Sequence, residues 1–274
     1  MACKPDQDQN DLIQSSSTPS DNPNGDSIEV ALSDRNDLPF ENSENDTDTL
    51  RYLALGDSYT IGESVAPGER WPNQLVEKIN SEQDNVHLSS AQIIAQTGWT
   101  TANLSNAMDQ QNVDSQQYDL VSLLIGVNNQ YQNQPLSLYQ AEFPALLQRA
   151  IDLVGGDASK VFVVSIPDYG YTPFGSGNQA NISSSLAQFN AACLEMTTAA
   201  GLAHYNITPI SQQYPGTSGL VAADGLHPSG YQYQLWVSSF WENVLDQLQW
   251  ERWPKCSLFR IEKFLPSGVF QNNW

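Results

Sequence analysis

Between residues 50 and 249, short apolar runs alternate with longer segments in which apolar residues recur at helical spacing. Of the short runs, Leu120–Ile125 and Val161–Ile166 are apolar enough to be strands buried on both faces. The predicted strands are Leu53–Leu55, Ala91–Ala95, Leu120–Ile125, Val161–Ile166 and Ala203–Ile207. The predicted helices are Trp71–Ile79, Thr100–Gln110, Leu136–Val154, Ile182–Ala200 and Tyr231–Leu248. Strict alternation of strand and helix predicts one α/β domain with three layers, in which helices cover both faces of a parallel sheet.

The segments that flank this domain differ from it in composition. Residues 1–49 consist mainly of Asp, Asn, Ser, Gln and Pro, which bury too little apolar surface to offset the loss of chain entropy, and we predict a disordered leader or tether. Residues 250–274 contain three of the seven tryptophans and four of the eleven basic residues. Three interpretations of this tail stay open: a segment docked against the domain, a surface for a weak partner or membrane, and a cloning or frame artefact.

The formal charge of −20 limits the partners of the chain. Residues 1–50 carry a net charge of −10, residues 51–250 carry −12, and only residues 251–274 are basic, with +2. Such a field repels phosphate backbones and anionic membrane surfaces, so nucleic acid is excluded as a partner. The sequence has no run of 18 or more apolar residues and no complete signal peptide, so we expect no transmembrane segment.

The three cysteines, Cys3, Cys193 and Cys256, match neither zinc-ligand nor CxxC spacing. Cys193 lies within an apolar helical pattern and is predicted to be a small core residue. Met1-Ala2-Cys3 resembles the start of a mature bacterial lipoprotein, in which a lipidated cysteine is followed by a polar tether. That resemblance implies an exported protein that is periplasmic, held at the cell surface, or secreted. The alternative is a free cysteine near a ragged or engineered start.

The first candidate for chemistry is the sequence Gly56-Asp57-Ser58, which directly follows the first predicted strand. A serine just past the carboxyl end of a buried parallel strand points into the crevice where open α/β sheets bind ligands. Thr60 stands where a nucleophile elbow would have its second glycine, so the motif is of another kind. On its own the triplet is more typical of an ordinary turn than of a nucleophile.

The segment from Asp224 to Gly230, before the last predicted helix, supplies what a serine nucleophile needs. A serine nucleophile requires an adjacent base, and the base requires a carboxylate that orients it. One loop offers both, with His227 as the base and Asp224 as the carboxylate. Pro228 suits the first position of the helix. A turn aspartate with a surface histidine is the structural alternative. Asp168 is a second acidic candidate, but Asp224 is preferred because it shares a loop with His227.

Two further segments offer hydrogen-bond donors for an oxyanion. Asn128 follows the third predicted strand, and its amide can donate to a developing alkoxide. Gly98 follows the second strand and can bring a backbone N–H close to the same oxygen. Without the other motifs, these segments are equally typical of a helix cap and a strand-to-helix turn.

Together these four motifs resemble the SGNH hydrolase superfamily, also called the GDSL lipase and esterase family, over residues 51–249. The resemblance implies a flavodoxin-like α/β/α sandwich with strand order 2-1-3-4-5. It also implies that Ser58 is the nucleophile and first oxyanion donor, Gly98 the second donor and Asn128 the third, with His227 as base and Asp224 as its orienting acid. The chain departs from the family at two positions. Tyr59 stands in place of leucine, and Asn129 stands where aspartate is usual.

The implied function is serine-dependent hydrolysis of a small-molecule carboxylic ester with a short to medium acyl chain, without metal or organic cofactor. A carbohydrate O-deacetylase, a lysophospholipase or thioesterase, an acyltransferase, and a non-catalytic module that binds glycans or a partner are the alternatives. Aromatic residues in loops at the carboxyl ends of strands either line the substrate pocket or pack the loops. They are Tyr59, Trp99, Tyr131, Tyr169, Tyr171 and Phe174.

Overall fold

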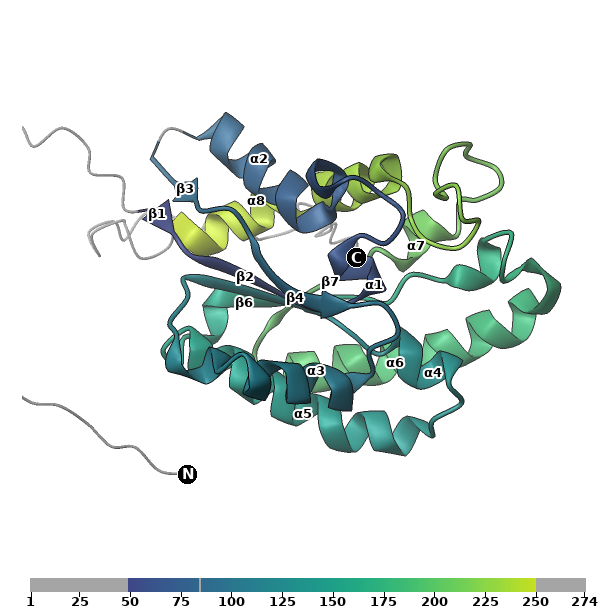
Figure 1. Ribbon diagram of the computed structural model, residues 1–274, viewed down its shortest axis with the longest axis horizontal. Coiled ribbons are helices and arrows are strands. Elements are labelled where there is room, and N and C mark those ends of the chain that lie inside the picture. The colour runs from purple at the N-terminus through teal and green to yellow at the C-terminus, as the bar shows by residue number, and fades with distance from the viewer. Residues whose placement is uncertain (1–48, 84, 250–274) are drawn as a thin grey trace, which may run out of the picture. The chain divides into compact units, whose positions relative to one another are not determined.

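The computed structural model describes residues 49–83 and 85–249 (Figure 1). Apart from Thr49, the predicted leader lies outside the described residues, as do the predicted lipid anchor at Cys3 and the basic aromatic tail at residues 250–274. These three predictions therefore stay predictions.

Five parallel strands form the central sheet in the order β4-β2-β5-β6-β7. The strands are β2 (Tyr52–Asp57), β4 (Gln92–Gln96), β5 (Leu120–Leu124), β6 (Val161–Val164) and β7 (Ala203–Tyr205). Numbered along the chain within this sheet, the observed order is 2-1-3-4-5, and the order implied by the family resemblance is confirmed. Every residue of β2, β5 and β6 is buried, which explains their continuous apolar runs.

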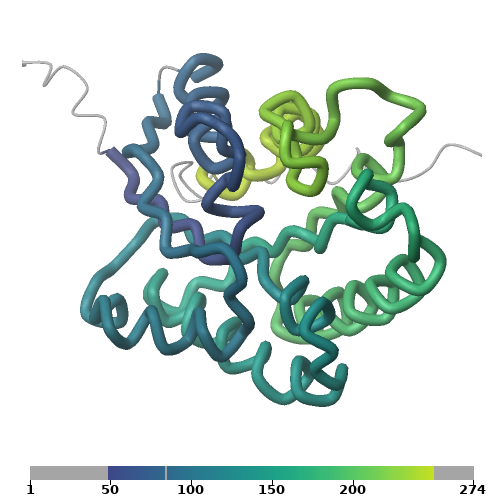
Figure 2. The backbone as a smooth tube through the Cα atoms, turned by 45° about the vertical axis from the view of Figure 1, so that its right-hand side comes forward, coloured from purple at the N-terminus to yellow at the C-terminus, as the bar shows by residue number. Residues whose placement is uncertain are grey.

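Helices cover both faces of the sheet (Figure 1). On one face, α2 (Trp71–Glu82) packs against α8 (Gly230–Gln249). The other face is covered by α3 (Thr101–Gln110), α5 (Leu136–Leu153) and α6 (Gln179–Ala199). Figure 2 shows the blue α2 and the yellow-green α8 on the same side of the strands. The predicted three-layer α/β architecture is thus confirmed. Among the helices of the described residues, none combines the length and apolar character needed to cross a membrane.

The remaining elements are short, and the apolar pattern did not predict them. β1 (Thr49–Leu50) and β3 (His87–Leu88) form a separate two-stranded parallel sheet. The short helices are α1 (Ser58–Ile61), α4 (Val127–Tyr131) and α7 (Thr208–Ser211), and the 3-10 turns are η1 (Pro67–Glu69), η2 (Val113–Ser115), η3 (Ala158–Lys160), η4 (Tyr169–Tyr171) and η5 (Ser176–Asn178). Segments of two to five residues are too short to display a hydrophobic period.

Aromatic rings join the sheet to the layer formed by α2 and α8. Trp71 of α2 and Phe240 of α8 both lie against Phe162 of β6, with ring centroids 6.3 and 5.9 Å away, and all three side chains are buried. Burying each large apolar side chain stabilises the fold by roughly 1.5–3 kcal/mol. Cys193 of α6 is also buried, so its predicted place in the core is confirmed.

Gly56 lies at the carboxyl end of β2, where the chain turns sharply from the strand into α1. A Cβ atom at this position would lie 2.2 Å from the Thr60 hydroxyl oxygen and 2.5 Å from the Leu124 carbonyl oxygen. Because the second of these atoms belongs to the backbone of β5, it cannot move aside easily. Only glycine allows α1 to approach the sheet this closely.

We therefore predict that Gly56→Ala lowers the free energy of unfolding by about 1–3 kcal/mol or more, the range typical of overpacking. Urea denaturation followed by circular dichroism would measure the change. Gly68→Ala is the matched control, because a Cβ at Gly68 meets no atom within 4 Å. Equal stability of the two variants would show that the approach of α1 to the sheet is not tight.

Candidate active site

The parallel pairing of β2 with β4 and β5 brings three loops to one edge of the sheet. Asp57 is paired with Gln96, and Gly56 is paired with Leu124. Ser58, the loop that contains Gly98 and the loop that leads to Asn128 therefore start side by side. Carboxyl ends of parallel strands are the usual position of ligand sites in open α/β sheets.

Ser58 is the first residue of α1 and is largely buried, with 4% of its surface exposed. Its carbonyl oxygen accepts hydrogen bonds from the Gly62 and Glu63 amides, and the first of these closes the single turn of helix. Gly62 adopts a left-handed conformation with φ of 67°, which ends the helix there. The short helix thus holds Ser58 at the end of β2.

Asp224 and His227 lie in direct contact, as their shared loop predicted. The Asp224 Oδ2 atom is 2.6 Å from His227 Nδ1, and the Oδ1 atom accepts hydrogen bonds from the backbone amides of Leu226 and His227. Burial by itself would raise the pKa of Asp224. The hydrogen bond from the His227 side chain, together with those from the Leu226 and His227 amides and the Ser64 hydroxyl, outweighs burial and lowers the pKa well below its usual range. Asp224 is therefore a carboxylate that orients the imidazole.

His227 meets the nucleophile segment through Tyr59. The ring centroids of Tyr59 and His227 are 5.9 Å apart in an edge-on arrangement, and His227 is largely buried. No hydrogen bond joins Ser58 to His227 in residues 49–83 and 85–249. The structure therefore brings His227, the predicted base, next to α1, where it contacts the residue that follows the predicted nucleophile. Burial holds the pKa of Tyr59 well above its usual value, with the nearby charge of Asp57 adding to the effect, so Tyr59 is a neutral phenol.

Ser64 is a functional candidate that the sequence did not indicate. Its hydroxyl donates a hydrogen bond of 2.7 Å to Asp224 Oδ2, the same oxygen that faces His227. Ser64 adopts a φ of 67°, which is unusual for a residue other than glycine. The neighbouring Glu63 accepts a 2.5 Å hydrogen bond from Thr97, the residue before Gly98. Since 160 residues separate Ser64 from Asp224, no local pattern reveals this contact.

The two predicted oxyanion donors lie on adjoining loops. Asn128, on α4, is 9% exposed, and its amide nitrogen donates to the Trp99 carbonyl at 2.9 Å. Gly98 has a φ of 87°, and a Cβ there would meet open space, so its backbone is accessible. The Gln132 side chain donates to the Gly98 carbonyl and joins the two loops a second time.

Asn129, the departure from the family pattern, is fully buried. Its amide oxygen accepts from the Thr101 backbone, and its amide nitrogen donates to the hydroxyl of Thr101 and to Gln134. Asn129 thus joins the start of α3 to α4. A neutral amide makes both donor and acceptor contacts here, whereas an ionised aspartate only accepts.

Three of the six aromatic residues predicted to line the pocket or pack the loops form one cluster. Tyr131 and Tyr169 pack together with Phe174, with ring centroids 6.1 to 6.4 Å apart, and Tyr131 is half-exposed. Tyr59 is instead buried against His227. Trp99 is partly buried and packs against the hydrophobic core. The remaining acid, Asp168, caps η4 and contacts Gln212, as a structural residue does.

Asp57 is fully buried and caps α1 by accepting a hydrogen bond from the Tyr59 amide. Its second oxygen, Oδ2, has no hydrogen-bond partner within the described part of the chain. Burial raises the pKa of Asp57 from 3.8 to about 8, even though hydrogen bonds from the Tyr59 and Asp57 amides act in the other direction. At neutral pH the side chain is therefore mostly protonated.

Within residues 49–83 and 85–249, no group of three or more His, Cys, Asp or Glu side chains could hold a metal ion. The neighbouring groups that can take part in chemistry are a serine, a histidine–carboxylate pair and a set of amides. This arrangement is suited to acyl transfer, in which the histidine moves a proton and the amides stabilise an oxyanion.

Comparisons with known proteins agree with this geometry. The model of the GDSL-like lipase/acylhydrolase family matches residues 54–235, about two thirds of the chain. No curated protein matches the sequence.

Several solved structures share the fold at low sequence identity. TesA is 16% identical, with a TM-score of 0.55 over 72% of this chain and 99% of its own. The psychrotrophic esterase EstA from Pseudoalteromonas sp. is 18% identical, with a TM-score of 0.53 over 73% of this chain and 98% of its own. Axe2, an acetylxylan esterase from Geobacillus stearothermophilus, is 18% identical, with a TM-score of 0.55 over 71% of this chain and 94% of its own. At these identities the likeness shows the fold.

Asp57 yields a prediction for stability against pH. Because its pKa in the folded state, about 8, lies above the unfolded value of 3.8, the folded protein holds a proton that the unfolded chain releases. The contribution of Asp57 to the free energy of unfolding thus falls as the pH rises from 4 to 8, by up to about 1.4 kcal/mol per pH unit, and is constant above pH 8. Asp57→Asn should remove this dependence and gain stability over wild type as the pH rises.

Guanidinium unfolding at intervals from pH 5 to 9 would measure the difference between wild type and Asp57→Asn. Asp246→Asn changes an exposed carboxyl and serves as the control. Parallel stability curves for wild type and Asp57→Asn would contradict a protonated Asp57.

Proposed function

The chain belongs to the GDSL-like lipase/acylhydrolase family, and from this premise we propose that it is a serine esterase that cleaves a carboxylic ester through an acyl-Ser58 intermediate. The observation that carries the proposal is the Asp224–His227 hydrogen bond beside α1, the helix that Ser58 begins. A binding module has no need of a carboxylate-oriented histidine next to a buried serine. The neighbours named as esterases, EstA and Axe2, are further support.

The proposed reaction has two proton transfers through His227. The Ser58 hydroxyl oxygen bonds to the ester carbonyl carbon while His227 Nε2 accepts the hydroxyl proton. When the tetrahedral intermediate collapses, the C–O bond to the alcohol breaks and His227 returns the proton to the leaving oxygen. Water then attacks the acyl-enzyme in the same way, which releases the carboxylic acid and regenerates the Ser58 hydroxyl. Asp224 stays ionised throughout and holds Nδ1–H.

In the proposed reaction, the oxygen of the ester carbonyl becomes an oxyanion that accepts hydrogen bonds from donors on three loops. The proposed donors are the backbone amides of Ser58 and Gly98 and the side-chain amide of Asn128. The accessible backbone at Gly98 supports this assignment, and so does the placement of Asn128 next to the same loop. One Asn128 N–H is already donated to the Trp99 carbonyl, which orients the amide and leaves the second N–H for the oxyanion.

Ser64 is proposed as a positioning residue that acts through Asp224. Its hydroxyl and the His227 ring share one carboxylate oxygen, so the two hydrogen bonds determine where that oxygen lies. The unfavourable left-handed backbone of Ser64 supports a role beyond local stability, because such conformations are retained where surrounding structure or function requires them.

The first prediction from the proposed function is that Ser58→Ala lowers kcat for p-nitrophenyl ester hydrolysis by at least about a thousandfold without changing the melting temperature. Wild type and variant are compared near pH 8 on p-nitrophenyl esters from acetate to laurate. The wild-type rates across this series give the preferred acyl-chain length. A fluorophosphonate probe should label wild type at Ser58 and leave the variant unlabelled. A wild-type protein that neither hydrolyses these esters nor takes the label would contradict the proposal and favour a binding module.

The second prediction concerns Ser64→Gly, which removes the hydroxyl and keeps the left-handed backbone without strain. We expect kcat to fall about five- to tenfold with little change in KM, while the melting temperature stays equal or rises. Asn112→Gly is the matched control, because Asn112 also has a positive φ, of 48°, and contacts none of the proposed site residues.

A double-mutant cycle separates positioning from general damage. In an Asp224→Asn background, Ser64→Gly should have little further effect on kcat, because the carboxylate on which it acts is gone. The same five- to tenfold loss in both backgrounds would overturn the proposed role of Ser64.

A further inference from the structure

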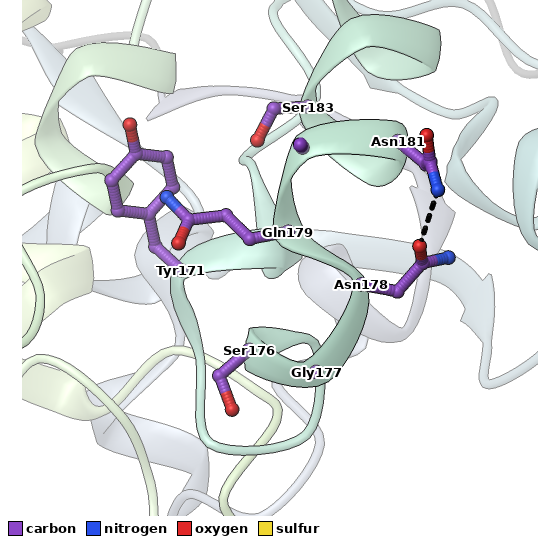
Figure 3. A pocket seen from close by; sticks show the side chains of 8 residues that line it. Tyr171, Ser176, Gly177, Asn178, Gln179, Asn181 and Ser183 are labelled. Atoms are coloured by element: carbon purple, nitrogen blue, oxygen red, sulfur yellow. Dashed lines mark hydrogen bonds between the residues drawn. The ribbon is translucent and has the colours of Figure 1, made fainter.

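The loop after β6 and the first turn of α6 border two adjoining hollows of about 590 and 550 Å³. Figure 3 shows the first of them, where the Gln179 side chain extends toward Tyr171 and Asn178 is hydrogen-bonded to Asn181. Gly177, Asn178 and Asn181 line both hollows, so the two lie next to each other at η5. Together they are large enough for more than one ring of a ligand.

Among residues 49–83 and 85–249, no charged side chain lines either hollow, although the chain carries a formal charge of −20. The polar groups of the lining are amides and hydroxyls, which both donate and accept hydrogen bonds. Amide and hydroxyl side chains of the lining include those of Asn133, Ser176, Asn178, Gln179, Asn181 and Ser183. This lining offers nothing to neutralise an ion of either sign.

Two half-exposed rings border the second hollow. Tyr131 and Phe174 are each 53% exposed, and their ring centroids lie 6.1 Å apart. The Tyr169 hydroxyl donates to Gln130, which holds the third ring of the cluster in place. Exposed rings beside amide groups offer apolar faces and hydrogen-bond partners to the same ligand.

This surface is attached to the proposed catalytic residues from two sides. Tyr131 lies on α4, three residues after Asn128 on the same short helix. On the other side, the Phe174 amide donates a 3.0 Å hydrogen bond to the carbonyl of Gly225, which follows Asp224. The residues that border the second hollow are therefore joined to the segments that carry Asn128 and Asp224.

We propose that these hollows bind the neutral, polyhydroxylated part of the substrate, so that the ester cleaved at Ser58 is carried by a carbohydrate. The inference rests on the proposed function and names the substrate class of that site. A long acyl chain needs a continuous apolar lining, which the amides and hydroxyls interrupt. An anionic ligand needs a cation, and the lining has none. A sugar ring with its hydroxyl groups matches both the amides and the aromatic faces.

The test compares acetylated xylo- and cello-oligosaccharides with p-nitrophenyl acetate, which has the ester but no sugar. Tyr131→Ala should lower the ratio of kcat/KM for the oligosaccharides to kcat/KM for p-nitrophenyl acetate by about five- to tenfold. Gly177→Leu should lower it further, because a Cβ at Gly177 meets no atom within 4 Å and the added side chain fills the space shared by both hollows.

Matched controls are Tyr231→Ala, whose ring is 48% exposed on α8, and Gly68→Leu, where a Cβ also meets open space. Both should leave the ratio unchanged. Calorimetric titration of Ser58→Ala with xylotetraose supplies a readout besides activity, and binding should be lost with Gly177→Leu.

The outcomes separate the two proposals. If wild type cleaves p-nitrophenyl acetate but not the acetylated oligosaccharides, or if Tyr131→Ala and Gly177→Leu leave the ratio unchanged, the carbohydrate site is overturned and the esterase stands. A strong preference for laurate over acetate overturns it as well. If wild type cleaves no ester at all, the proposed function itself fails.

Discussion

Strand β2 is hydrogen-bonded along both edges, to β4 and to β5, and the register of these pairs determines where the segments with Ser58, Gly98 and Asn128 begin. Because Asp57 lies opposite Gln96 and Gly56 opposite Leu124, three chain segments leave the sheet together. The lack of a side chain at Gly56 then lets α1 fold back against Thr60 and the β5 backbone. A shift of one residue would place Ser58 elsewhere and exchange the side chains that pack on the two faces of β2.

The turn after α1 connects the two halves of the site. Glu63 contacts Thr97 on the side of the oxyanion loops, and Ser64 contacts Asp224 on the side of the base. Both hydrogen bonds come from adjacent residues, and the second requires a left-handed backbone at Ser64. Such strain, together with the buried Asp57 carboxyl, lowers stability at the same place where the reactive groups meet. The surrounding aromatic core compensates for it.

The sequence predicted most of the fold because its long elements carry a clear hydrophobic period and its central strands are continuously apolar. It also indicated Ser58, Gly98, Asn128, Asp224 and His227, because turn residues place them directly after strands or before the last helix. Contacts between distant segments had no such signal. The bond from Ser64 to Asp224 depends on a backbone angle, and the separate pairing of β1 with β3 involves two residues on each strand. The different positions of Tyr59 and Tyr131 likewise follow from packing and not from local pattern.

His227, the proposed base, and the proposed sugar surface depend on the same loops. The strand-like bridge between Val221 and Pro228 and the hydrogen bond from Ala222 to the His227 carbonyl close the loop that contains Asp224. Outside that loop, the Phe174 amide holds the Gly225 carbonyl, and Pro173 packs close to Gly225. Phe174 thus borders the ligand surface with its ring and supports the loop of Asp224 with its backbone. The proposed sugar surface and the loop of Asp224 therefore share one piece of backbone, residues 173–174.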